Sequence, residues 1–430
     1  MNPRTYHDPL HGAIRLDPGL PAEALAIDLI DSAPFQRLRR IRQLGPAFLT
    51  FHGAESSRFT HSLGVLHLAR LALQHLERSA PELARHRGLL YAAALLHDLG
   101  HAPLSHSGEE MFGLRHEHWS GQLVRRHPAL RDRLEAYAGG TTDAVADLLE
   151  QGRCECRAIQ SLVSSQLDCD RLDYLLRDSY STGASYGQLD LQRILAALTL
   201  APDGTLAIHP RGLMAVEHYL VVRNLMYRSV YNHRLNVVCN WLLAQVISSA
   251  RQLGPERVPA DAVMARWLWP SEALDQALDL ETFLANDDVR TAYHLVRWME
   301  EGPTELAEPC ARLLNRRLLK ASDLAGLEPG QRLELLALAQ RLSGAAGLAP
   351  ERTCALITRQ CRGYDPYKGG LRLWNGERLQ ALEQRSPLVQ SLIRPTQLVW
   401  LIHPAEVAEA LRLRITALQP PGDMTSGRTP

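Results

Sequence analysis

Apolar side chains recur at helical spacing along much of this chain. The clearest stripe advances in steps of three and four residues, as a buried helical face does, and consists of Leu66, Ala69, Leu73 and Leu76. Residues 213–250 contain few helix-breaking residues and are predicted to form one long helix. Further helices are predicted over residues 87–97, 275–300 and 331–343. The pattern is typical of a mainly α protein.

Strand signals are fewer and shorter. Two short apolar runs, residues 204–209 and 397–403, are predicted as strands. The stretch 252–262 holds two prolines and a glycine, so we expect it to separate two parts of the chain. The expected organisation is a helical part at 1–250, a mostly helical part with a short β element at 251–418, and a flexible tail at 419–430 that is rich in Pro, Gly, Ser and Thr.

The composition is that of an ordinary globular protein. The 430 residues include 47 Lys and Arg and 47 Asp and Glu, so the formal net charge is zero. A neutral balance argues against general binding to nucleic acid or to a membrane surface. No apolar run approaches the roughly 20 residues that span a bilayer. The first residues also lack the apolar core of a secretion signal. We therefore expect a cytoplasmic enzyme.

Histidines are concentrated in one part of the chain. Eleven of the 18 lie between His52 and His127, where an even spread would place about three. The adjacent pair His97 and Asp98 combines two ligand types that first-row divalent metals favour. Neighbouring residues on a regular helix point about 100° apart, so both can face one ion only near a helix end, and Gly100 predicts such an end. Taken singly, each histidine is more often an ordinary core residue than a metal ligand, and the combination is what favours a metal site.

The order of these residues resembles a known signature. His61, then His97 with Asp98, then Asp170 is similar to the H…HD…D signature of HD-domain metallophosphohydrolases. The surrounding segments resemble one branch, the deoxynucleoside triphosphate triphosphohydrolases, typified by the catalytic core of the vertebrate SAM- and HD-domain enzyme and its bacterial relatives. Those segments are residues 35–39, 43–45, 58–65, 96–106 and 170–174, within a resemblance that runs from Asp8 to about Arg234.

The resemblance implies a fold and a metal site. We expect an HD-domain helical bundle with a small α+β C-terminal part. Its metal ligands would be His61, His97, Asp98 and Asp170, holding one divalent ion. Nitrogen and oxygen donors leave iron, manganese, magnesium, nickel and zinc open. A second magnesium ion could enter with the substrate triphosphate.

The reaction implied by the resemblance is hydrolysis of a dNTP at its α-phosphorus, which gives a deoxynucleoside and inorganic triphosphate. The leaving 5′-oxygen needs a proton, which His106 or His116 could donate, and His106 is favoured. Glu117 follows His116 and would orient its ring. The alternative is that His116 and Glu117 form an ordinary polar pair at the start of a surface helix.

Further residues match positions that bind the substrate in this branch. Arg58, Arg171 and Arg223 would contact the phosphates. Arg223 also starts a four-residue repeat with Tyr227 and Tyr231, so the three share one face of the predicted helix. That face would grip the triphosphate and the sugar, or it is an ordinary exposed face. Tyr227 stands where the vertebrate enzyme has histidine, which leaves its contact open.

The sugar contacts follow from the same resemblance. Gln43 and Asp178 would bond the 3′-hydroxyl, with Tyr174 beside them. Leu44 and Tyr231 would leave no room for a 2′-hydroxyl. A buried hydroxyl without a partner costs about 1–3 kcal/mol, which would explain a preference for deoxyribose.

The resemblance also implies a second nucleotide site. The residues that match activator positions are Arg4, Asp31, Gln36 and Arg39, with His233 and Arg234 near a further activator. An aspartate can accept from guanine N1–H and its amino group while an arginine donates to O6. In this hypothesis GTP or dGTP activates the enzyme between subunits of a homodimer or homotetramer. The alternative is a helix whose arginines pair with Asp31 and solvent.

Two other functions remain open on the sequence. The first keeps the HD chemistry but takes another nucleotide, such as a monophosphate or an alarmone. The second is a nucleotide-sensing or nucleic-acid-binding regulator with a silent site, although all four matched metal ligands are present. A steep salt dependence of affinity would reveal nucleic-acid binding.

Overall fold

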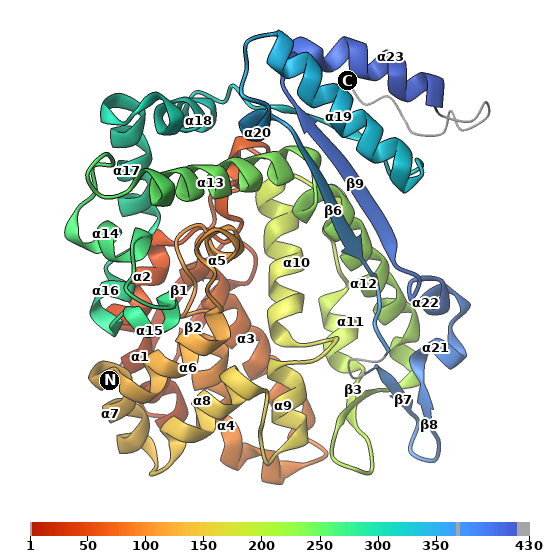
Figure 1. Cartoon of the computed structure of the whole chain (residues 1–430). Helices are drawn as coiled ribbons and strands as arrows, with labels where there is room; N and C mark the ends of the chain where they lie inside the picture. Colours follow the sequence, from red (N-terminus) through yellow and green to blue (C-terminus); the bar gives the residue numbers. More distant parts are fainter. Residues whose placement is uncertain (1, 367–369, 419–430) are drawn as a thin grey trace.

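The computed structural model describes residues 2–366 and 370–418 and shows the predicted mainly α protein (Figure 1). The predicted tail at 419–430 lies outside the described residues. The main apolar core contains buried residues from Ile14 to Ile402, so the C-terminal part of the chain packs against the N-terminal part. The boundary between two domains stays a prediction.

Helix α3 (Arg58–Leu76) forms the centre of the bundle, and the four residues of its predicted apolar stripe are buried. Gly64 lets α3 approach α10 (Cys169–Thr182), because a Cβ at that position would lie 1.9 Å from Oδ1 of Asp173. His61 lies about one turn earlier on α3. The close contact therefore places His61 beside α10.

Helix α4 (Arg87–Leu96) ends one residue before His97, so the predicted helix end is confirmed. Gly100 acts in a different way from the one expected, because its backbone is not left-handed. A Cβ there would lie 2.2 Å from the carbonyl oxygen of His116, at the start of α6 (His116–Arg126). The glycine therefore allows two histidine-bearing segments to pack together.

The prediction of one long helix over 213–250 is wrong. Helix α12 (Leu213–Met226) runs into a π-helical turn at Tyr227–Tyr231, and α13 (Arg234–Leu253) then begins anew. The side chain of Asn232 donates back to the preceding turn, and the His233 ring caps the next helix. Polar side chains that bond the local backbone compete with helical hydrogen bonds, which explains the break.

The predicted helix at 275–300 is likewise divided. The described elements are α15 (Leu274–Ala277), α16 (Leu280–Leu284) and α17 (Asp288–Glu301). Asp279 and Asp287 accept hydrogen bonds from backbone N–H groups and so start α16 and α17 as N-caps.

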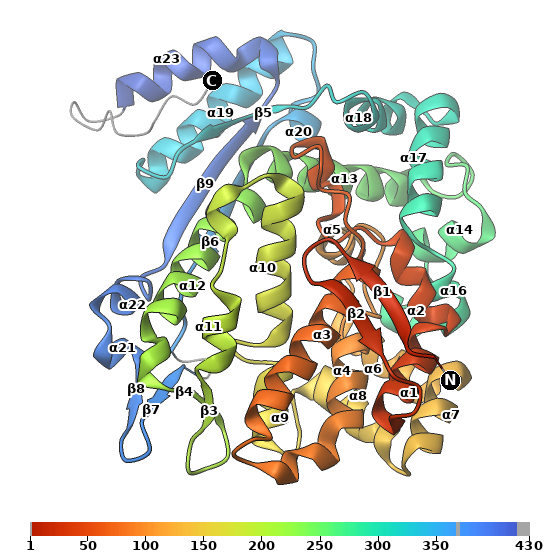
Figure 2. The same ribbon diagram turned by 180° about the vertical axis from the view of Figure 1, so that it is seen from behind.

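Both predicted strands are confirmed, as β4 (Leu206–Ile208) and β9 (Thr396–His403). One sheet has the order β3 (Leu198–Leu200), β4, β7 (Arg372–Trp374) and β8 (Leu379–Ala381), and another has β5 (Lys320–Asp323), β9 and β6 (Ala355–Cys361). The β6–β9 pair runs along one side of the molecule (Figure 1). An unpredicted hairpin of β1 (Arg4–Asp8) and β2 (Gly12–Leu16) lies near α1 and α2 (Figure 2).

The predicted helix at 331–343 is confirmed within α19 (Pro329–Ala345). The remaining α-helices are α1 (Pro21–Ile30), α2 (Ala33–Arg37), α5 (His106–Phe112), α7 (Pro128–Tyr137), α8 (Thr141–Gln151), α9 (Arg157–Val163), α11 (Leu191–Ala196), α14 (Ala262–Leu268), α18 (Thr304–Leu314), α20 (Pro350–Thr353), α21 (Leu382–Arg385), α22 (Pro387–Ser391) and α23 (Ala408–Leu418). Among the described residues, no helix is both long enough and apolar enough to span a bilayer.

Candidate active site

Three of the four predicted metal ligands converge at the junction of α3, α4 and α10. Oδ1 of Asp170 lies 3.0 Å from Nε2 of His61 and 3.6 Å from Nε2 of His97, and the two ring nitrogens are 3.3 Å apart. Ligands at right angles around an ion, each about 2.1 Å from it, lie about 3 Å from one another. The spacing of this cluster, which we call the metal cluster, fits a single divalent ion.

Both histidine rings of the metal cluster are oriented by their second nitrogen. Nδ1 of His97 donates to the carbonyl oxygen of Ala94 at 2.9 Å, and Nδ1 of His61 donates to Asp173 at 2.7 Å. Each Nε2 therefore faces the other members of the cluster and is the ring nitrogen that could bind an ion. Burial lowers the pKa of His61, but Asp170 and Asp173 outweigh it and raise the pKa to about 10. The cluster has an excess of negative charge that a cation would balance.

Asp98, the fourth predicted ligand, lies at the edge of this cluster. Its carboxylate oxygens are 3.4 Å from Nε2 of His97 and 3.5 Å from Nε2 of His61. Burial alone would raise the pKa of Asp98, but Arg58 and the nearby His97 and His101 hold it well below its usual range. Asp98 is therefore ionised and close enough to share an ion that the metal cluster could hold.

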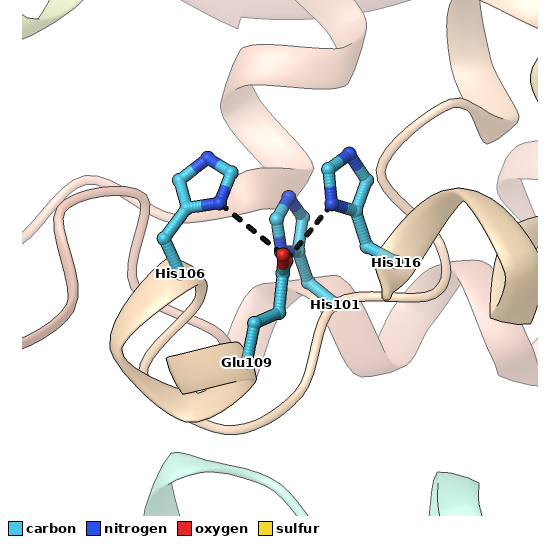
Figure 3. Close-up of side chains that lie close together, drawn as sticks. All are labelled: His101, His106, Glu109 and His116. Atoms are coloured by element: carbon cyan, nitrogen blue, oxygen red, sulfur yellow. Dashed lines mark ion pairs between the residues drawn. The ribbon is translucent and has the colours of Figure 1, made fainter. Parts of the chain in front are cut away.

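A second cluster gathers around Glu109, which we call the Glu109 cluster. Nδ1 of His101 lies 2.6 Å from Glu109 Oε1, and Nδ1 of His116 lies 2.9 Å from the same oxygen. Nδ1 of His106 lies 3.5 Å from Oε2. Figure 3 shows all three rings around the carboxylate, with the second nitrogens of His106 and His116 turned away from it. One carboxylate thus orients several imidazoles.

The Glu109 cluster holds its histidines in different charge states. Burial opposes a positive ring at His116, but Glu109 raises the pKa of His116 above its usual value. Burial, Arg58 and His116 instead lower the pKa of His101 to about 3. The two rings stack with their centroids 4.1 Å apart. Glu109 therefore favours the charged form of His116, which lies against a neutral His101.

Glu117 does not occupy the orienting position that the sequence assigned to it. Its carboxylate lies 3.8 Å from Nδ1 of His116, compared with 2.9 Å for Glu109, and its side chain is 42% exposed. Glu109 was not predicted, although its i+3 spacing from His106 on a helix was available in the sequence. The geometry favours Glu109 as the partner of His116.

Most predicted substrate residues line one cavity of about 640 Å³ beside the two clusters. The predicted site residues that line it are Gln43, Leu44, Arg58, His97, Asp98, His106, His116, Glu117, Asp170, Arg171, Tyr174, Asp178, Tyr227 and Tyr231. Of the predicted metal and substrate ligands, His61 lies beneath this surface and Arg223 is not among the lining residues. Gln43 Oε1 and Asp178 Oδ1 are buried without a hydrogen-bond partner. Tyr231 donates to the other oxygen of Asp178 at 3.0 Å.

The arginines predicted to bind phosphate differ in how far other protein groups already bind their guanidinium groups. Arg58 donates to Asp98, to Ser105 Oγ and to the Gln43 carbonyl oxygen, so its guanidinium is engaged by the protein. Arg223 is bonded to Gln166 and reaches 9% exposure. Arg171 is paired with Asp168 but lines the cavity. Arg115 also lines it, with a 74% exposed side chain, although the sequence did not single it out.

The predicted activator residues divide into separate groups. Arg4 pairs with Asp31, and the Arg39 Nε donates to Gln36 at 2.7 Å. The Gln36 amide bonds the carbonyl oxygen of Ile30, next to Asp31, so these four side chains are neighbours. The alternative pairing of helix arginines with Asp31 is not what the structure shows, because the partner is Arg4. His233 instead caps α13, and Arg234 follows it as the first residue of that helix.

Comparison with known proteins gives a family match over the same region. Residues 58–175 match the HD domain family and residues 189–257 match the HD associated region. The uncharacterised protein YwfO of Bacillus subtilis is 33% identical over 399 residues, which cover 90% of this chain and 89% of YwfO.

Two further similar proteins are described by an activity. The deoxynucleoside triphosphate triphosphohydrolase SAMHD1 of Danio rerio is 31% identical over 286 residues, which cover 57% of this chain and 45% of that protein. The crystal structure of a phosphohydrolase from Bacteroides thetaiotaomicron has a TM-score of 0.81 at 26% identity, covering 94% of this chain and 100% of that one.

Proposed function

Because this chain belongs to the HD-domain phosphohydrolase family, we propose that it is a metal-dependent dNTP triphosphohydrolase. The observation that carries this proposal is that one cavity borders both the metal cluster and the Glu109 cluster. Phosphoester hydrolysis needs positive charge at the phosphate and a proton for the leaving oxygen. The metal cluster would supply the positive charge, and the adjacent Glu109 cluster would supply the proton.

The metal cluster would hold one divalent ion through His61, His97 and Asp170, with Asp98 as a further ligand. When bound, the ion would supply Lewis-acid charge at the scissile phosphate. Arg58 holds the Asp98 carboxylate through Nη1, so we assign it an orienting role rather than a phosphate contact.

The Glu109 cluster would supply the proton. The side chain of His106 is 68% exposed and turns Nε2 away from Glu109. We assign it as the donor to the leaving 5′-oxygen, with a charged His116 binding phosphate beside it. Glu109 fixes the ring orientation of both and favours the positive form of His116.

Binding of a deoxyribose accounts for the unpartnered acceptors of the cavity. A sugar hydroxyl could donate to Asp178 or Gln43, whose buried oxygens lack partners. Leu44 and Tyr231 would occupy the space beside the 2′ carbon. Arg171 and Arg115 would meet the triphosphate at the cavity wall.

Regulation by GTP or dGTP at Arg4, Asp31, Gln36 and Arg39, and assembly into a homodimer or homotetramer, belong to the same proposal. It is supported by the grouping of these four side chains on one surface. A phosphohydrolase specific for another nucleotide is the competing function.

The test is a product assay with the purified protein and manganese or magnesium. Each dNTP is supplied singly and then all four together with GTP, and triphosphate is resolved from pyrophosphate. We expect a deoxynucleoside and triphosphate. Asp170→Asn should abolish turnover and remove bound metal, whereas Asp132→Asn, on the exposed side of α7, should change neither. Absence of triphosphate with every metal would reject the dNTP assignment and direct the search to monophosphates.

A further inference from the structure

The first residue of α17, Asp288, contacts two segments beside the cavity that lie far from it in the sequence. Asp288 is 3% exposed, and its two carboxylate oxygens accept from two backbone groups. Oδ1 accepts from Leu104 N at 2.7 Å, and Oδ2 accepts from Arg42 N at 2.9 Å. These donors lie in segments that are remote from α17 in sequence and border the cavity. A buried carboxylate with two N–H donors is a strong link between them.

The turn that Asp288 holds has an unfavourable backbone. Leu104 and Ser105 are consecutive non-glycine residues with φ of 62° and 57°. Such left-handed conformations are costly for L-residues and persist only when the surroundings impose them. His106 follows directly and begins α5. The direction in which His106 enters the cavity therefore depends on this turn.

The turn is also connected to the metal cluster. Ser105 Oγ donates to the carbonyl oxygen of Arg42 at 2.6 Å and accepts from Arg58 Nε at 2.9 Å. Arg58 in turn holds Asp98. Asp288 is thus connected, through the Leu104–Ser105 turn and Arg58, to the predicted metal ligand Asp98.

The residues beside Asp288 reinforce the junction. The buried Arg37 side chain donates to the carbonyl oxygens of Asn286 and His101. Arg40 also pairs with Asp287, but its side chain is 49% exposed, so this pair contributes little to the junction. Three consecutive residues before and at the start of α17 therefore meet segments 37–42 and 101–105.

We propose that Asp288 is a positioning residue for catalysis, which holds the Leu104–Ser105 turn so that His106 and Arg58 face the cavity correctly. The inference rests on the proposed function for its kinetic part. It assigns a catalytic contribution to a residue outside both family-matched regions, 58–175 and 189–257.

The experiment compares Asp288→Asn with Asp287→Asn in the full-length protein. An asparagine at 288 presents one acceptor and one NH₂ donor, so one of the two backbone N–H groups loses its partner. At 287 the same change keeps an oxygen for the helix cap. Amide hydrogen exchange is followed in peptides that contain Leu104 and Arg42, together with kcat, KM and metal content.

We expect exchange to rise about tenfold or more in at least one of the two peptides in Asp288→Asn, because one buried donor loses its acceptor. We expect kcat to fall about 10²-fold, as a displacement of about 1 Å can cause, with KM and metal content unchanged. Asp287→Asn should leave both peptides and kcat near the wild-type values.

Unchanged exchange in Asp288→Asn would overturn the inference, as would raised exchange with unchanged kcat. If Asp288→Asn does not fold, Asp288→Glu keeps the charge while displacing it, and the same exchange and kcat criteria apply. A wild-type protein that hydrolyses no dNTP would reject the proposed function, and the exchange pattern would then decide alone whether Asp288 holds the turn.

Discussion

Glu109 favours the positively charged form of His116 at the candidate site. Glu109→Gln keeps the shape of the side chain but removes the charge that raises the pKa of His116. We expect turnover to fall about 10²-fold or more, in the range of lost acid–base catalysis. The pKa of His116 should fall, so the decline of activity with rising pH should begin at a lower pH. The measurement is a pH profile of kcat and kcat/KM.

Glu117→Gln is the matched control, because it makes the same change on a half-exposed neighbour of the same histidine. Its profile should follow the wild type. A larger loss in Glu117→Gln than in Glu109→Gln would restore the assignment made from the sequence.

Asp178 carries a second prediction, which concerns stability rather than turnover. Burial raises the pKa of this carboxyl to about 7, against the opposing effects of His61 and Tyr231, whereas an unfolded aspartate has a pKa near 3.9. A raised folded pKa means that the folded state binds the proton more tightly. The stabilising contribution is therefore complete below about pH 4 and is lost as the pH rises through 7.

Asp178→Asn removes this titration while keeping an oxygen for the Tyr231 hydroxyl. In metal-free protein, we expect the free energy of unfolding of the variant, relative to that of the wild type, to rise by up to about 4 kcal/mol from pH 4 to pH 8. Thermal or urea unfolding across this range measures the difference. A difference that is constant with pH would show that folding does not raise the pKa of Asp178.

The site residues that could be predicted are those in short motifs. His97 and Asp98 are adjacent in the chain, and a family resemblance adds His61 and Asp170. Glu109 could have been found from its helical spacing to His106. Asp173 orients His61 through a contact between residues 112 positions apart in the chain. Asp288 contacts the Leu104–Ser105 turn across 184 positions. No local sequence pattern specifies either contact.

At the scale of elements, Gly64 sets the distance between α3 and α10. Gly64→Ala would place a methyl group 1.9 Å from Asp173 Oδ1 and 2.6 Å from Arg177 Nη2, so the helices must separate. We expect a loss of about 1–3 kcal/mol of stability and weaker metal binding, because Asp173 orients His61. Urea unfolding and metal titration check the two effects.

Gly330→Ala is the control for this change. It lies in α19, nothing lies within 4 Å of the added Cβ, and its φ is not positive. It should leave stability unchanged or raise it by up to about 1 kcal/mol. Equal stability of the two variants would contradict the close packing of α3 on α10.

Helix periodicity identified most elements but could not locate their interruptions. Residues 213–250 have a continuous apolar pattern, yet Asn232 and His233 bond the local backbone and divide the helix. The β1–β2 hairpin was missed because only Ile14, Leu16 and Asp8 are buried in it. Short strands with mostly exposed side chains give little alternation to detect.

At the scale of the whole molecule, the C-terminal part contacts segments that border the candidate active site. The start of α17 contacts both the catalytic turn and segment 37–42, which continues from Gln36 and Arg39 of the proposed activator site. A ligand bound near Asp31 would therefore touch a segment that is joined to the turn before His106. This connection would give the proposed activation a physical route.

Asp31→Ala tests that route. The Arg4–Asp31 pair is nearly half exposed, and such pairs contribute at most about 1 kcal/mol, so the fold and basal turnover should persist. Any increase of turnover and of molecular mass with GTP should disappear, measured by initial rates and light scattering over a range of GTP concentrations. Asp28→Ala, about one turn earlier on the exposed side of α1, should respond as the wild type does. An activation curve in Asp31→Ala that matches the wild type would place the activator elsewhere, and a wild type without any response to GTP would remove the activator site from the proposal.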